Sequence, residues 1–118
     1  MSTGDPELDR IIAELRAAFR VRTAQEIPLI ERHYAALKAG IVPRTEAAAL
    51  RRIVHQMGGS AGSFGFPALS EAAIPLDDAI GFALDQSDAE LVEAAKGWEA
   101  LVDRLLVACR AIQEGSEP

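Results

Sequence analysis

Apolar residues recur at intervals of three and four positions along almost the whole of the 118-residue chain. The first such run contains Leu8, Ile11, Ile12, Leu15 and Phe19. This spacing places side chains on one face of an α-helix, and no segment shows the alternating pattern of a half-buried strand. Aromatic residues make up only 5% of the chain, and alanine and leucine dominate its apolar content, which also favours helices. The sequence therefore predicts an all-α fold.

Caps, glycines and prolines divide these runs into separate expected helices. Asp5 and Pro6 are typical of a helix start, and Thr23 with Glu26 resembles a capping box that opens a second helix. The remaining boundary signals are Gly40, Thr45, Gly65, Pro67 and a second capping box formed by Ser87 and Glu90. Short connections between such helices favour antiparallel neighbours.

We therefore expect one domain over residues 1–118, built as an antiparallel four-helix bundle with an additional N-terminal helix. The bundle is expected over about 20–113, the N-terminal helix over about 6–20 and a frayed tail over 114–118. Pro28 and Pro75 lie inside predicted helices, where proline is expected to bend or break the helix.

Charge and composition exclude several classes of function. The formal net charge of −6 disfavours nucleic acid and anionic membranes as partners. No stretch resembles a signal peptide or a membrane-spanning helix. The single cysteine, Cys109, fits a reducing compartment, and two histidines with one cysteine make a zinc site improbable. The sequence predicts a cytoplasmic monomer with no cofactor, no metal and no nucleotide-binding loop.

His55 is followed by an unusual cluster of glycines at positions 58, 59 and 62 within a segment predicted to be helical. Each glycine in a helix interior costs about 0.5–1 kcal/mol relative to alanine. A helix that accepts this cost beside one histidine indicates a need for a surface without side chains. His33 has no such surroundings and is expected to be an ordinary solvated histidine.

A helical wheel places this cluster on one side of the predicted helix. At about 100° per residue, His55 lies roughly 140° from Leu50, which belongs to the apolar stripe. Gly59 and Gly62 fall within about 40° of His55, and Gly58 about 60° away. We therefore expect an exposed imidazole on a surface formed by these three glycines.

Such a surface suits phosphoryl transfer. A neutral imidazole nitrogen is a good nucleophile near pH 7, and transfer needs a close approach of the two reacting groups. Arg51 and Arg52 lie one turn before His55 and would stabilise phosphoryl oxygens or steer an acidic partner.

The segment from His55 to Gly65, with the sequence His-Gln-Met-Gly-Gly-Ser-Ala-Gly-Ser-Phe-Gly, resembles the signature of the histidine phosphotransfer (HPt) domain family. That signature has an apolar residue two positions after the histidine, then usually lysine and glycine, small residues and a further glycine. The helix order over about residues 20–112 is also similar to the family.

The resemblance implies a phosphocarrier without catalytic machinery of its own. His55 would be the phosphorylated residue, and Arg51, Arg52, Gly58, Gly59 and Gly62 would form the surface on which the partner docks. Phe64 and Gly65 would close the histidine helix and set the turn to Pro67. The implied partner is a receiver domain, in a response regulator or a hybrid histidine kinase, which exchanges phosphoryl groups between its aspartate and the histidine.

Gly58 departs from the family pattern, because the usual lysine is expected at this position. A lysine restored there is predicted to reach the neighbourhood of the imidazole. Two alternatives stay open on the sequence: an adaptor that binds receivers without accepting phosphate, and a bundle of the histidine-kinase dimerisation type. The second would need an acidic residue beside His55, where Gln56 stands, and an ATP-binding domain.

Overall fold

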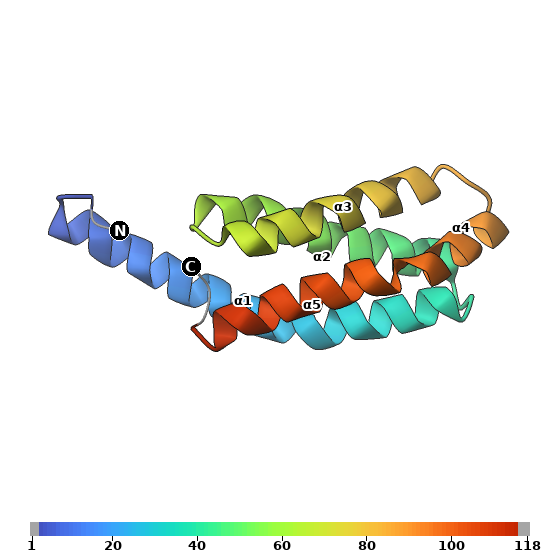
Figure 1. Cartoon of the computed structure of the whole chain (residues 1–118), viewed down its shortest axis with the longest axis horizontal. Helices are drawn as coiled ribbons and strands as arrows, with labels where there is room; N and C mark the ends of the chain where they lie inside the picture. Colours follow the sequence, from blue (N-terminus) through green and yellow to red (C-terminus); the bar gives the residue numbers. More distant parts are fainter. Residues whose placement is uncertain (1–2, 116–118) are drawn as a thin grey trace.

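The computed structural model describes residues 3–115, and these residues form helices and turns with no strand. The helices are α1 (Pro6–Lys38), α2 (Pro43–Ser63), α3 (Pro67–Ala83), α4 (Asp88–Ala95) and α5 (Glu99–Gln113), with a 3-10 turn, η1 (Lys96–Trp98), between the last two (Figure 1). The predicted all-α fold is confirmed.

Four helices close the bundle. α1 packs against α2, α2 against α3, α3 against α5, and α5 against α1, so each long helix has two neighbours. α4 lies at one end of the bundle (Figure 1), and α4 with η1 leads the chain from α3 into α5. The short connections from α1 to α2 and from α2 to α3 make these neighbours antiparallel, as expected.

The core contains the apolar stripes that the sequence indicates. On α2, Leu50, Val54 and Met57 are almost completely buried, and Leu69 and Leu76 of α3 are buried equally well. The side chains of α2 are four and three positions apart and those of α3 are seven apart, so each set lies on one face of its helix, and burying them fixes which face of α2 points inward. The opposite face of α2, which carries His55, is thereby left outside the core.

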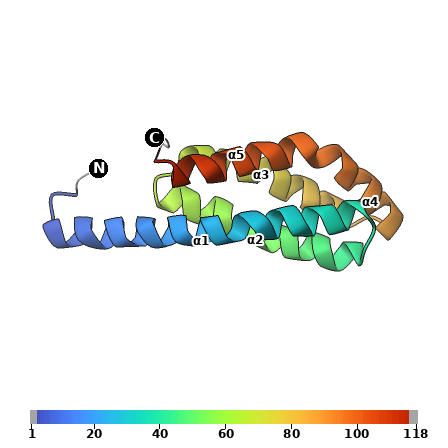
Figure 2. The ribbon, with the colours of Figure 1, turned by 90° about the horizontal axis from the view of Figure 1, so that it is seen from below.

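One boundary prediction is wrong, because α1 is a single helix of 33 residues rather than two. Thr23 does not cap a new helix, and Pro28 lies inside α1 without ending it. The core holds the helix together across this point, since Phe19, Thr23 and Ile30 are all buried. Local stop signals were therefore overridden by packing. The N-terminal part of α1 continues beyond the other helices (Figure 2).

Because α1 continues through Thr23, the hydroxyl group of this residue is in an unfavourable environment. Its Oγ1 is buried and has no hydrogen-bond partner among the described residues. A buried hydroxyl without a partner costs roughly 1–3 kcal/mol. Thr23→Val keeps the shape and helix propensity of the side chain, so we expect a gain of roughly 1 kcal/mol in the free energy of unfolding, measured by urea denaturation. A loss of stability would mean that the hydroxyl has a partner.

Two other boundary signals are confirmed, whereas α2 begins at Pro43 and not at Thr45. Asp5 accepts hydrogen bonds from the backbone N–H groups of Glu7 and Leu8, and Ser87 with Glu90 forms the reciprocal capping box at the start of α4. Two further expectations are corrected. Pro75 lies within an uninterrupted α3, and the expected last helix is divided by η1. Of the expected tail, residues 116–118 lie outside the described part of the chain.

Candidate functional site

The turn between α2 and α3 sets how these two helices face each other. Gly65 has a φ of +79°, a left-handed conformation that glycine adopts without strain. The backbone N–H of Phe66 donates a hydrogen bond to the carbonyl of Ala61. This is the hydrogen bond of a Schellman motif, which ends a helix at a glycine such as Gly65. Pro67 then starts α3 at once. Residues at similar distances from this turn therefore lie opposite each other on the two helices.

This pairing brings a carboxylate to His55. The imidazole is 71% exposed, and its Nδ1 lies 2.8 Å from Oδ2 of Asp77 on α3, whose side chain is only 18% exposed. An ionised carboxylate can only accept a hydrogen bond, so the pair holds the proton of a neutral imidazole on Nδ1. The lone pair of a neutral His55 is then on Nε2, the nitrogen that Asp77 does not occupy.

Arg51 takes part in the same cluster. Its Nε donates to Oδ1 of Asp77 at 3.2 Å, so the two oxygens of one carboxylate serve Arg51 and His55 separately. Arg52 is exposed and lines a shallow hollow beside His55 together with Arg51. Two of the predicted site residues, His55 and Arg51, are therefore joined by a third side chain.

Gly59 and Gly62 are exposed on the His55 side of α2, as the wheel predicted. A Cβ atom added at Gly59 would meet no other atom within 4 Å, and one added at Gly62 would make an ordinary contact of 3.6 Å with Oγ of Ser70. Both glycines thus leave open space in front of α2, and both line hollows next to the imidazole.

Gly58 is a correction, because it is buried between α2 and α3 rather than exposed. A Cβ atom there would lie 3.1 Å from Cβ of Ala73, closer than a normal contact between two carbons. The Gly58 carbonyl also accepts a hydrogen bond from Oγ of Ser70 at 3.0 Å. Gly58 therefore allows the two helices to pack closely, and a lysine at this position would not extend freely toward His55.

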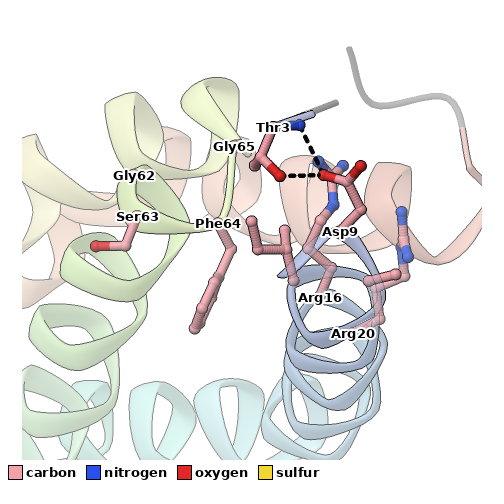
Figure 3. A pocket seen from close by; sticks show the side chains of 10 residues that line it. Thr3, Asp9, Arg16, Arg20, Gly62, Ser63, Phe64 and Gly65 are labelled. Carbon is pink, nitrogen blue, oxygen red and sulfur yellow. Dashed lines mark hydrogen bonds between the residues drawn. The ribbon is translucent and has the colours of Figure 1, made fainter. Parts of the chain in front are cut away.

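A second cleft adjoins the glycine surface (Figure 3). It lies between the N-terminal part of α1 and the end of α2, and it shares Gly62 and Ser63 with the hollow beside His55. Arg16 and Arg20 extend from α1 on its other side (Figure 3). Their guanidinium carbons lie 4.7 and 5.2 Å from the ring centroid of Phe66, which fixes both cations next to the α2–α3 turn.

The sequence interpretation missed Asp77. A carboxylate in the middle of a predicted helix gives no signal by itself. The position of the turn at Gly65 could have predicted Asp77. In an antiparallel pair of helices, His55 must face a residue at a similar distance on the other side of the turn. Asp77 is the acidic residue in that register, with its side chain directed to α2.

The remaining histidine and the cysteine are engaged elsewhere. His33 is half-buried, and its Nδ1 pairs with Glu46 of α2, so the expectation of a solvated histidine is corrected. Cys109 is completely buried in the core, with Sγ 3.6 Å from Sδ of Met57. Burial raises the pKa of the Cys109 thiol to about 12, which keeps it protonated at neutral pH.

The sequence model of the Hpt domain matches residues 7–108, and the chain belongs to this family. Hpt domains carry phosphoryl groups on histidine in two-component signalling and interact with receiver domains and histidine kinases. The match covers most of the chain, including all of α2 and α3. Searches of curated proteins and of solved structures gave no significant match.

Two further observations concern residues 3–115. No helix in this part of the chain is long and apolar enough to cross a membrane. Within the same range, no three His, Cys, Asp or Glu side chains come together in a way that could hold a metal ion.

Proposed function

We propose that the chain relays a phosphoryl group between receiver-domain aspartates through Nε2 of His55. The observation that carries this proposal is the exposed imidazole whose other nitrogen, Nδ1, is held by Asp77. Membership of the Hpt family supplies the general chemistry. The arrangement of His55 and Asp77 supports the choice of histidine and of ring nitrogen.

The proposed transfer needs no acid or base beyond this pair. The Nε2 lone pair attacks the phosphorus of a receiver's aspartyl phosphate, and the P–O bond breaks as the N–P bond forms. The aspartate leaves as a carboxylate with the bonding electrons. The imidazole ring, still protonated on Nδ1, becomes positively charged, and the Asp77 carboxylate faces that charge at 2.8 Å. Transfer to a second receiver is the reverse of these steps.

We propose that the receiver docks on the surface formed by Gly59, Gly62, Arg51 and Arg52 around His55. The exposed glycines allow the partner's active site to approach the imidazole. The arginines favour an acidic partner surface, although the chain as a whole has a net charge of −6. We also propose that the protein acts as a monomer, because a second copy bound on this surface would exclude the receiver. A cytoplasmic location is a further part of the proposal.

The direct test is incubation of the protein with a receiver domain carrying labelled aspartyl phosphate. We expect label to move to the protein, and its bond to be stable in alkali and labile in acid, as a phosphoramidate is. Label that stays on the receiver, while the two proteins bind each other, would instead support the adaptor alternative. The replacement of the usual lysine by Gly58 is the observation that keeps this alternative in the test.

Gly62→Leu is predicted to weaken docking without unfolding the protein. Leucine is the better helix former, by about 0.8 kcal/mol, and a Cβ at this position has room. The leucine side chain would stand on the proposed surface, in front of the hollow beside His55. We expect binding of a receiver domain to weaken roughly tenfold or more, as for a side chain forced into a closely packed interface, measured by titration calorimetry.

Gly97→Leu is the matched control for this variant. Gly97 lies in η1, next to α4 and away from the end of α2 that carries Gly62, and a Cβ there would meet no atom within 4 Å. Receiver binding should stay at the wild-type level in this control. If Gly62→Leu also binds normally, the receiver docks on another part of the molecule.

A further inference from the structure

The guanidinium group of Arg51 lies directly against the backbone of Gly81 on α3. A Cβ atom added at Gly81 would be 2.8 Å from Nη2, 3.0 Å from Cζ and 3.3 Å from Nε of Arg51. A separation of 2.8 Å is shorter than the Cβ atoms of real proteins adopt, so the guanidinium group would have to shift. The guanidinium group therefore fills the space that any other residue at position 81 would need.

The position of Arg51 is important because Arg51 holds the carboxylate of Asp77. Its Nε donates to Oδ1 of Asp77 at 3.2 Å, and Oδ2 of the same carboxylate accepts from Nδ1 of His55 at 2.8 Å. Asp77 cannot turn toward one partner without changing its geometry to the other. A guanidinium displaced from Gly81 would therefore release the carboxylate that orients the imidazole.

Glycine is otherwise unfavourable at this position. Gly81 lies in the last part of α3, where its backbone is helical and alanine would be preferred. It is not at a turn with positive φ, unlike Gly40 or Gly65. The contact with Arg51 is the feature of its surroundings that excludes a side chain.

We propose that Gly81 is a positioning residue for phosphoryl transfer: by lacking a side chain, it seats Arg51 against α3 so that Arg51 and Asp77 together hold His55 with its proton on Nδ1. A free neutral imidazole populates both tautomers, and only the one protonated on Nδ1 has its nucleophilic lone pair on Nε2. The consequence for transfer rests on the proposed function, whereas the consequence for the tautomer does not.

The test compares Gly81→Ala with Gly97→Ala, since a Cβ at Gly97 meets nothing within 4 Å. The ¹⁵N chemical shifts of the His55 ring, measured by NMR at a pH where the ring is neutral, report its tautomer. We expect Gly81→Ala to raise the population protonated on Nε2, and Gly97→Ala to leave it unchanged. The His33 ring, paired with Glu46 away from this cluster, should be unchanged in both.

The rate of phosphoryl transfer from a labelled receiver is the second measurement. For Gly81→Ala we expect a drop of roughly threefold to tenfold, the size of effect of one hydrogen bond that positions a reacting group. Thermal stability should not fall, because the displaced atoms are the end of a flexible, half-exposed side chain. A stability loss large enough to unfold α3 would contradict the inference.

A double-mutant cycle shows whether Gly81 acts through Arg51. In an Arg51→Met background, we expect Gly81→Ala to change neither tautomer nor rate any further. An effect that persists without Arg51 would overturn the inference, as would an unchanged tautomer in Gly81→Ala.

If the tautomer responds as expected but wild-type protein accepts no phosphate, the proposed function fails and the positioning role stands. If wild-type and Gly81→Ala proteins transfer equally with equal tautomers, only the positioning role fails.

Discussion

His55→Gln is expected to abolish phosphoryl acceptance while leaving the fold intact. Glutamine has no nucleophilic nitrogen, so no phosphoramidate can form. The side chain is 71% exposed and makes no contribution to the core, and a substitution at such a position usually changes stability by less than about 0.5 kcal/mol. Its amide can still donate to Asp77. Transfer of label from a phosphorylated receiver and thermal unfolding followed by circular dichroism check the two parts separately.

His33→Gln is the matched control for this experiment. It should accept phosphate at the wild-type rate, because His33 lies on α1 and pairs with Glu46 rather than with the residues around His55. A modest loss of stability is expected, since the pair of His33 and Glu46 is half-buried. Label retained by His55→Gln would assign the phosphoacceptor to another residue, and strong destabilisation of the same variant would show that the imidazole supports the fold.

Helix positions were predictable from the sequence wherever periodicity and caps agreed. The stripe through Leu50, Val54 and Met57 determined which face of α2 is buried, and the box of Ser87 with Glu90 determined where α4 begins. The continuity of α1 was not predictable in the same way. Thr23 and Pro28 both indicate a boundary locally, and only the packing of the flanking residues in the bundle overrides them.

Some residues of the site could be predicted from the sequence, and others could not. Exposure of His55, Gly59 and Gly62 follows from the phase of one helix, so a helical wheel was sufficient. Asp77 and Gly81 act on the site from α3, and their contribution depends on the register of two helices. That register is set by the turn at Gly65, so it could be estimated, but the hydrogen-bonded cluster itself depends on how closely α3 packs on α2.

Gly58 shows where the wheel fails. The wheel places it roughly 80° from Leu50, between the apolar stripe and the His55 face. Such an edge position is exposed on an isolated helix and buried once a neighbouring helix packs closely. α3 covers this edge, with Ala73 and Ser70 next to Gly58. The glycine thus serves the packing of two helices, and it does not form part of the open surface.

Gly58→Lys is therefore expected to destabilise the protein, although lysine is a better helix former than glycine by roughly 0.7 kcal/mol. The first carbon of the side chain would lie 3.1 Å from Cβ of Ala73, and the longer chain would have to push α2 and α3 apart. Forcing extra atoms into a packed interior costs roughly 1–3 kcal/mol. Urea denaturation should show a loss of this size.

Gly59→Lys is the control that separates packing from charge. It adds the same side chain one residue further along α2, where a Cβ meets nothing within 4 Å, so we expect a gain of roughly 0.7 kcal/mol from helix propensity. Gly58→Ala combined with Ala73→Gly then tests the contact itself. Each single change should be destabilising, and the double variant less so than their sum, because the second change removes the carbon that the first one meets. Wild-type stability in Gly58→Lys would instead mean that the lysine leaves the α2–α3 contact, and the predicted approach of its ammonium group to His55 would then stand.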